Sequence, residues 1–186
     1  MKEIFAHRFK TARLVSGISQ KELADNLSIT KQAVSKYEKG LMLPDSTALL
    51  KIADILDYKP DYFFRPLTVK LDSVEFRKRS SLKGRRLATV KAQVIDKLER
   101  YLELEELMNI INDFDNPISN ITIRRVNDVE NACNQLLAAW KLGSNPLPNI
   151  LEMVEDNGIK VIEMDAENSF DGLSTWIGKI PVIVVN

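Results

Sequence analysis

The sequence is poor in residues that bind metals or cross-link a chain, because its 186 residues include one cysteine, Cys133, and one histidine, His7. One cysteine excludes an internal disulfide and fits a reducing cytoplasm. One cysteine and one histidine also leave no set of three zinc ligands of the usual kind. We expect Cys133 to be buried in a core and His7 to take a polar surface position. We therefore expect no metal and no cofactor.

Long apolar runs are missing too. The strongest one, residues 180–185, has the length of a strand and not the roughly 20 residues that span a bilayer. Lys2 and Glu3 stand early and no apolar run follows them, so no signal peptide is visible. The sequence has no glycine-rich phosphate loop and no Ser/His/Asp set. These absences predict a cytoplasmic chain with no membrane partner and no catalytic residues.

Net charge is absent as well, since 26 Lys and Arg balance 26 Asp and Glu. The charges are nevertheless segregated. Residues 1–66 hold 11 basic and 8 acidic side chains, residues 67–92 hold 8 and 2, and residues 93–186 hold 7 and 16. A basic N-terminal part and an acidic C-terminal part indicate nucleic-acid contact at one end of the chain. A solvated basic linker explains the same pattern, so charge alone leaves both interpretations open.

Residues 1–66 show helix signals and no strand signal, which predicts a compact five-helix domain. The first helix is expected over residues 2–15, and the last is a short segment at 62–64 that Pro66 closes. Ser19 and Glu22 make a capping box, in which each side chain satisfies a backbone N–H of the other. The other start and stop signals are Gly17, Thr30, Gly40, Pro44 and Asp45.

Residues 67–112 are expected to form a basic linker and then a long helix. Leu67, Val69 and Leu71 alternate as in a strand, and the basic run at 76–83 is expected to be mobile. The helix, from about 84 to 112, carries an apolar stripe at Val90, Val94, Leu98, Tyr101, Met108 and Ile111. Sustained heptads are missing, which favours packing on its own domain over an intermolecular coiled coil.

Residues 113–186 are expected to form a partial α+β domain. Helical patterns cover residues 126–141 and 147–156. Strand-like segments then follow at 159–164, 172–177 and 180–185, with a hairpin turn at Gly178 and Lys179. The expected fold is thus mainly α, with a five-helix domain, a long helix and a partial α+β domain.

The stretch from Ser19 to Gly40 reads SQKELADNLSITKQAVSKYEKG and resembles the helix-turn-helix of the Xre and phage-repressor family. The resemblance covers about a third of the chain. It runs through Gly17, Ser19, Gln20, Glu22, Leu23, Ala24, Leu27, Ile29, Ala33, Val34, Tyr37, Glu38, Gly40, Pro44, Leu49, Ile52 and Ala53. It implies that residues 1–66 are a repressor-like domain that binds double-stranded DNA.

The third helix of that motif is expected to enter the major groove, where only outward side chains reach base edges. By resemblance, base reading falls to Lys31, Gln32, Ser35 and Lys36. Glutamine can bond adenine bidentately, and lysine can bond guanine acceptors or phosphate. By the same resemblance, phosphate contacts fall to Ser19, Gln20, Thr30 and Lys39. The alternative interpretation is that these polar residues serve only solubility.

The family also implies a buried pair between Arg13 and Glu38, which would tie the first helix to the third. One position departs from the family, because Ser28 stands in the turn where glycine is usual. A left-handed Ser28 would cost on the order of 1 kcal/mol. A turn of another shape would instead tilt the third helix.

From about residue 126 the chain resembles the beginning of ImmA/IrrE metallopeptidase-like domains. The resemblance rests on Trp140 to Gly143, Pro146, Glu155 to Val161, Asp171 to Trp176 and Pro181 to Asn186. In that family the next element is a helix with HExxH, which binds zinc. This chain has no such helix, so we expect a fragment whose parent continues into it.

Together these observations favour a sequence-specific transcriptional regulator of the repressor type. It would act as a homodimer on half-sites about 34 Å apart. The C-terminal part would sense a signal, dimerise or bind a protein partner. The alternatives are a DNA-tethered zinc metallopeptidase whose catalytic part lies beyond residue 186, and an antitoxin-type regulator. The basic segment 76–91 adds phosphate contacts or serves only as a linker.

Overall fold

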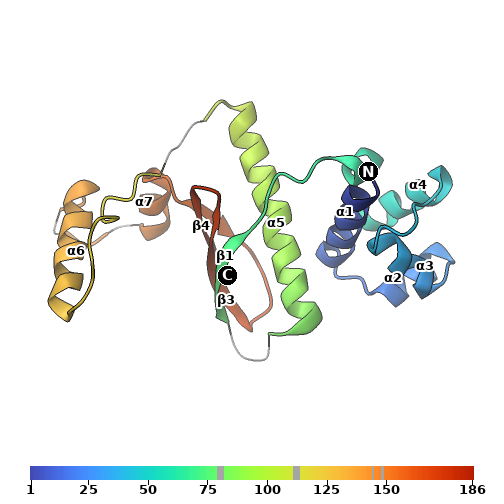
Figure 1. The fold of residues 1–186 in the computed structure, drawn as a ribbon, viewed down its shortest axis with the longest axis horizontal. Coiled ribbons are helices and arrows are strands. Elements are labelled where there is room, and N and C mark those ends of the chain that lie inside the picture. The colour runs from blue at the N-terminus through green and yellow to red at the C-terminus, as the bar shows by residue number, and fades with distance from the viewer. Residues whose placement is uncertain (79–81, 111–113, 144, 148) are drawn as a thin grey trace.

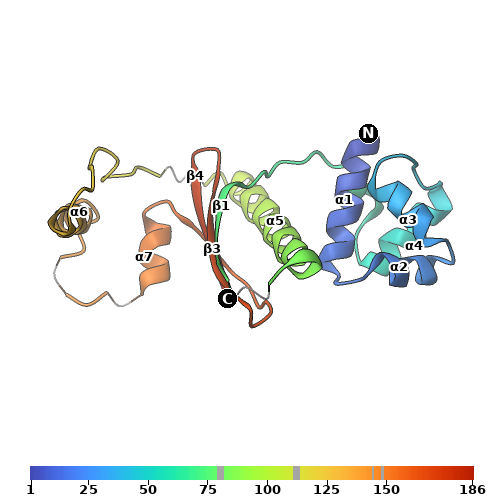
Figure 2. The same ribbon diagram turned by 60° about the horizontal axis from the view of Figure 1, so that its bottom comes forward.

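The computed structural model describes residues 1–78, 82–110, 114–143, 145–147 and 149–186. A helical bundle formed by the N-terminal residues lies at one end of the molecule (Figure 1). The long helix α5 and a small sheet occupy the middle, and α6 lies at the opposite end in both views (Figures 1 and 2). The mainly α fold with a partial α+β part is confirmed.

The bundle consists of four α-helices and one 3-10 helix, which confirms the five-helix prediction. They are α1 (Lys2–Val15), α2 (Gln20–Leu27), α3 (Lys31–Glu38), α4 (Ser46–Leu56) and the 3-10 helix η1 (Pro60–Phe64). The predicted capping box of Ser19 and Glu22 is present at the start of α2. Thr30 and Asp45 cap α3 and α4 with their side chains. Local polar signals thus set where the helices begin.

The bundle core is aromatic at its centre. Phe5 and Phe9 on α1 stack at 5.6 Å between ring centroids, and Tyr37 of α3 meets both rings edge-on. Edge-to-face contacts suit the opposite charges of a ring's face and rim. The remaining buried members are Ala12, Leu23, Ala24, Leu27, Val34, Ile52, Ala53, Leu56 and Phe63. This core holds α3 against α1 and leaves its other face outside.

Ser28 adopts the left-handed conformation at the end of α2, with φ 55° and ψ 40°. Its backbone N–H donates back to the Ala24 and Asp25 carbonyls and so closes the helix. Gly17 and Gly40 take positive φ without a side chain to crowd the backbone. The turn between α2 and α3 therefore has the shape that glycine would favour, at the cost of strain at a serine.

The sheet has four strands in the order β1-β3-β4-β2. Its strands are β1 (Asp72–Lys78), β2 (Lys160–Glu163), β3 (Phe170–Ile177) and β4 (Ile180–Val185). The β3–β4 pair is the predicted hairpin, with Ile177 opposite Ile180 around the turn. Strand β2 runs parallel to β4, and β1 runs antiparallel to β3.

Strand β1 corrects the prediction for the linker. The alternation at 67–71 suggested a strand there, whereas the strand lies at Asp72–Lys78. Residues 76–78 of the basic run, expected to be mobile, are hydrogen-bonded to β3. Residues 79–81 of that run lie outside the described residues. The strand that pairs with β1 is β3, about a hundred residues further along the chain, and no local sequence pattern predicts this pairing.

Helix α5 (Gly84–Leu107) packs on the sheet of the same chain. Val90, Val94 and Leu98 of the predicted stripe are buried against the strands. The helix ends before the predicted boundary at 112, Met108 is exposed, and Ile111 lies outside the described residues. The predicted boundary between residues 67–112 and residues 113–186 stays a prediction. Side chains from both segments, on α5 and on the strands, pack into one hydrophobic core.

The last two helices, α6 (Val126–Ala139) and α7 (Ile150–Asp156), are shorter than their predicted ranges. Cys133 on α6 is exposed, so the expectation of a buried cysteine is wrong. Ala132 is the one residue of α6 with under a tenth of its surface exposed. The helical pattern at residues 126–141 was sufficient to predict a helix but not what that helix packs against.

The strain at Ser28 yields a prediction for stability. We expect Ser28→Gly to raise the free energy of unfolding by about 0.5 kcal/mol, because it removes left-handed strain but adds glycine's entropy in the unfolded chain. Urea unfolding monitored by circular dichroism measures this change. Lys39→Gly is the control, because exposed Lys39 ends α3 at a negative φ of −93°, where glycine relieves no strain and should lower the free energy of unfolding. Equal losses in both variants would contradict the left-handed turn.

Candidate nucleic-acid interface

Helix α3 has one face in the core and one in solvent. Val34 and Tyr37 are buried, whereas the side chains of the opposite face are exposed or, at Ser35, half-buried. The exposed ones are Lys31, Gln32, Lys36 and, just after the helix, Lys39. This confirms which residues of α3 face outward, while their assignment to bases or phosphates stays a prediction.

The starts of α2 and α3 present hydroxyl groups that are already oriented. The Ser19 hydroxyl accepts the Glu22 N–H at 3.1 Å, and the Thr30 hydroxyl accepts the Ala33 N–H at 3.2 Å. Each hydroxyl keeps its own proton, which can be donated to an acceptor. Each hydroxyl therefore has a proton free to donate, while phosphate contact by Ser19 and Thr30 stays a prediction.

Gln20 has a role that sequence reasoning missed. Its side-chain amide donates to Glu38 Oε2 at 2.6 Å, so it joins α2 to α3 inside the protein. The amide nitrogen carries a second N–H. A phosphate contact by Gln20 stays a prediction and would use that second N–H.

The buried pair that the family implied is present. Arg13 Nε donates to Glu38 Oε1 at 2.5 Å, and Arg13 Nη1 donates to the Ile18 carbonyl at 2.7 Å. The side chains are 6% and 7% exposed. Arg13, Gln20 and Glu38 thus link α1, α2 and α3 through hydrogen bonds to one carboxylate.

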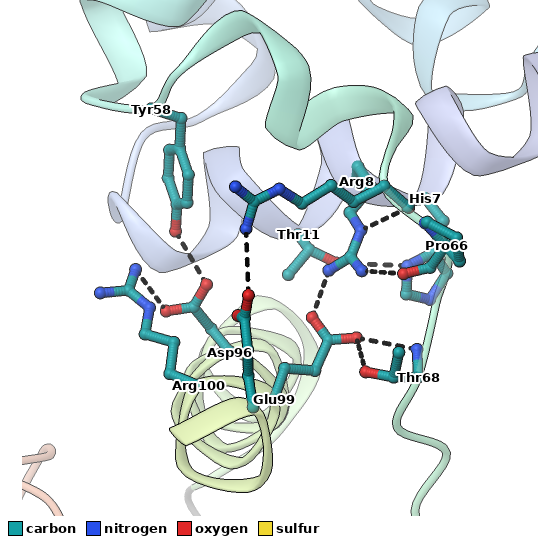
Figure 3. Close-up of polar contacts among 11 residues, drawn as sticks. His7, Arg8, Thr11, Tyr58, Pro66, Thr68, Asp96, Glu99 and Arg100 are labelled. Carbon is teal, nitrogen blue, oxygen red and sulfur yellow. Dashed lines mark hydrogen bonds and ion pairs between the residues drawn. The ribbon is translucent and has the colours of Figure 1, made fainter. Parts of the chain in front are cut away.

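A second buried ion pair joins the bundle to α5 (Figure 3). Arg8 on α1 pairs with Glu99 on α5, and their side chains are 5% and 11% exposed. The Arg8 guanidinium also donates to the carbonyls of Arg65 and Pro66. The other oxygen of Glu99 accepts from the backbone N–H of Thr68 at 3.3 Å. Bundle, connecting segment and α5 therefore meet at one satisfied charge pair.

Tyr58 and Asp96 add a second contact at this junction. The Tyr58 hydroxyl donates to Asp96 Oδ1 at 3.2 Å, and Arg100 contacts Asp96 Oδ2 at 2.9 Å (Figure 3). Burial raises the pKa of Asp96, although Arg100 and the tyrosine hydrogen bond act in the opposite direction. Burial also raises the pKa of Tyr58. The junction thus holds a carboxylate that would be easier to protonate than an exposed one.

A cavity of about 630 Å³ lies beside the junction. Its walls carry both signs of charge, which gives it no strong net attraction for an ion. The basic residues are Arg8, Lys59, Arg65 and Arg100, and the acidic ones are Asp57, Asp96, Glu99, Glu103 and Glu106. Among the described residues, no three His, Cys, Asp or Glu side chains are grouped to hold a metal. No described helix is long and apolar enough to cross a membrane.

The Arg13–Glu38 pair gives the second prediction. We expect Arg13→Met and Glu38→Leu each to lower the free energy of unfolding by about 3–5 kcal/mol, because each strands a buried charge. The double variant should lose less than the sum of the two. Thermal and urea unfolding measure all three. Arg65→Met, from a half-exposed pair with Asp61, is the control and should lose less than about 1 kcal/mol. Single variants that unfold like the wild type would contradict a structural role.

Asp96 gives a prediction for pH dependence. Its folded pKa lies above the unfolded value, so the folded state binds the proton more tightly and Asp96 contributes more stability as pH falls. Asn cannot ionise, so we expect Asp96→Asn to gain stability relative to wild type at pH 7 and to lose that advantage towards pH 4. Urea unfolding across this range measures it. Asp25→Asn, at an exposed carboxylate, controls for lost charge. A difference independent of pH would contradict the effect of burial.

Comparison with known proteins agrees with this geometry. The Helix-turn-helix family HTH_3 matches residues 9–63. The chain is similar to the uncharacterized SPbeta prophage-derived HTH-type transcriptional regulator YonR of Bacillus subtilis, with 36% identity over 69 residues, 37% of this chain and 64% of YonR. It is also similar to the HTH-type transcriptional regulator ImmR of Bacillus subtilis, with 38% identity over 55 residues, 30% of this chain and 43% of ImmR.

Among solved structures, the chain is similar to the restriction-modification controller protein C.AhdI from Aeromonas hydrophila. The identity is 28% and the TM-score 0.33, over 34% of this chain and 96% of that one. The chain covers less than two thirds of the length of YonR and of ImmR. The family match lies within the N-terminal bundle, at residues 9–63. Residues 9–63 form an Xre-type helix-turn-helix domain of the kind found in HTH-type transcriptional regulators.

Proposed function

We propose that this protein is a sequence-specific DNA-binding transcriptional regulator of the repressor type. The observation that carries the proposal is the face of α3 opposite Val34 and Tyr37, which presents lysine, glutamine and serine side chains on a helix-turn-helix domain. A helix of this kind fits the major groove of B-DNA. The named relatives are HTH-type transcriptional regulators, which supports the same activity here.

The contacts divide by what each side chain can bond. Lys31, Gln32, Ser35 and Lys36 lie along the exposed side of α3 and are proposed to read base edges. Ser19, Gln20, Thr30 and Lys39 lie at the ends of α2 and α3 and are proposed to bind phosphates. Phosphate contacts would set the position of the domain on the duplex, and base contacts would give the preference for sequence.

The protein is proposed to bind as a homodimer. One α3 reads only a few base pairs, and a two-fold dimer places a second α3 about 34 Å away, one turn along the groove. The operator would then be close to palindromic. The C-terminal part would supply the dimer contact, a sensing site or a protein partner.

The likeness of the C-terminal part to the start of ImmA/IrrE domains is a second, narrower proposal. It is supported by the order of α6, α7, β2 and the β3–β4 hairpin along the chain. These elements contain the segments that resemble the start of ImmA/IrrE domains. The DNA-tethered metallopeptidase of that proposal would need ligands from beyond residue 186. Metal analysis of the native gene product tests it, and less than one zinc per chain would overturn it.

Selection of bound duplexes from a random pool tests the main proposal. We expect an enriched, roughly palindromic site. Lys31→Ala with Gln32→Ala should reduce the preference for that site over random DNA about tenfold or more, since a base contact is worth about 1–3 kcal/mol. Lys39→Ala should lower affinity for all duplexes and reduce the salt slope by about one.

Lys141→Ala is the control, because Lys141 is exposed and follows α6 by two residues, and α6 lies at the opposite end of the molecule (Figure 1). It should leave both affinity and preference unchanged. A pool without an enriched site, together with unchanged binding by the α3 variants, would exclude sequence-specific regulation.

A further inference from the structure

The first turn of α5 carries a group of cations outside the helix-turn-helix domain. Lys83, Arg85 and Arg86 are all exposed, with side chains of Arg85 and Arg86 at 51% and 67%. They belong to the segment 67–92, which holds 8 basic and 2 acidic residues. From the sequence alone this segment was equally a linker or a source of phosphate contacts.

The structure places this turn beside the start of α2. The Arg85 guanidinium donates to the Gly17 carbonyl and lies 3.9 Å from the Glu22 carboxylate. Gly17 is three residues before Gln20, and consecutive Cα atoms are 3.8 Å apart, so at most about 11 Å of chain separates them. One DNA strand carries a phosphate about every 3.4 Å of helix axis. Arg85 is therefore within a few phosphates of the contacts proposed for Ser19 and Gln20.

We propose that Arg85, flanked by Lys83 and Arg86, binds the DNA phosphate backbone and extends the interface from α2 onto α5. This inference rests on the proposed function, because it assumes that the start of α2 faces DNA. The partner is the phosphate backbone of duplex DNA, which requires cations and no base contact.

Charge complementarity supports this partner. Glu22 is an exposed carboxylate at the start of α2 and would repel a phosphate there, and Arg85 lies close enough to offset that charge. The remaining chain, residues 93–186, holds 16 acidic and 7 basic residues. Its helix α6 lies at the end of the molecule opposite the bundle (Figures 1 and 2). A polyanion would therefore be attracted to the side of α2 and the first turn of α5 rather than to the acidic remainder of the chain.

The contacts of Arg8 and Tyr58 drawn in Figure 3 attach α5, the helix that carries Arg85, to the bundle. Asp96 and Glu99 follow Arg85 by eleven and fourteen residues, about three and four turns of a helix with 3.6 residues per turn. All three residues thus lie on the same face of α5, the face that contacts the bundle through Tyr58 and Arg8. Arg8 and Glu99 would act here as positioning residues, since they attach α5 to the bundle and their side chains are buried.

The test is a titration of operator and random duplexes with the full chain between 50 and 200 mM salt. We expect Arg85→Gln to weaken both duplexes equally at low salt and to reduce the slope of log affinity against log salt by about 0.9. Between 50 and 200 mM salt, the loss of affinity of Arg85→Gln relative to the wild type should therefore shrink about 3.5-fold. Arg85→Lys keeps the charge and should keep the slope.

Arg124→Gln is the matched control, because Arg124 is also an exposed arginine just before a helix, here α6, which lies at the far end of the molecule (Figure 1). It should leave affinity and slope unchanged. If Arg85→Gln changes only the melting temperature while the slope stays at the wild-type value, Arg85 is a structural contact and the inference fails. If the wild type binds no operator, the proposed function fails as well. Operator binding with an unchanged slope in Arg85→Gln would overturn this inference alone.

Discussion

The buried pair between Arg13 on α1 and Glu38 on α3 fixes the helix on which the proposed DNA reading depends. Each side chain is almost fully enclosed, and the pair is extended by bonds from Arg13 to the Ile18 carbonyl and from the Gln20 amide to Glu38. A buried ion pair adds little net stability compared with apolar residues of similar volume. It does fix geometry, because a guanidinium and a carboxylate meet well only in a narrow range of orientations. We infer that the pair contributes chiefly to the orientation of α3.

Helix α1 carries a second arginine with a different task. Arg8 and Arg13 are five residues apart, which at 3.6 residues per turn places them about 140° apart around the helix. Arg13 faces α3, and Arg8 faces α5 and the connecting segment. The aromatic core around Phe5 and Phe9 anchors the same helix. One rigid helix therefore sets the positions of both α3 and α5, and the geometry between them follows from α1.

The helix-turn-helix domain could be predicted because its signals are local. The capping box of Ser19 and Glu22, the cap at Thr30 and the apolar spacing of α4 each lie within one or two turns. The Arg13–Glu38 pair followed from resemblance to a family, not from spacing. The outward face of α3 could be predicted from the apolar residues on its other side, because Val34 and Tyr37 are buried as expected.

What sequence reasoning missed depends on distant partners. Strand β1 forms because β3, about a hundred residues away, offers it a hydrogen-bonding edge. Arg8 and Glu99 are separated by 91 residues, and nothing local tells which carboxylate an arginine on an apolar helix will meet. Cys133 was expected to be buried from its residue type, but burial depends on what covers a helix, and α6 has few covered side chains.

The same long-range contacts decide whether the two basic regions act together. On the sequence, the lysines of α3 and the arginines of α5 are about fifty residues apart, and a free linker would let them bind phosphates independently. In the structure, the Arg8–Glu99 and Tyr58–Asp96 contacts and the bond from Arg85 to Gly17 attach α5 to the bundle at three places. A cation held in place loses little conformational freedom on meeting a phosphate, whereas a mobile one must be ordered first. Because α5 is fixed to the bundle, its basic first turn belongs to the DNA-binding surface proposed above and does not act as a separate, mobile linker.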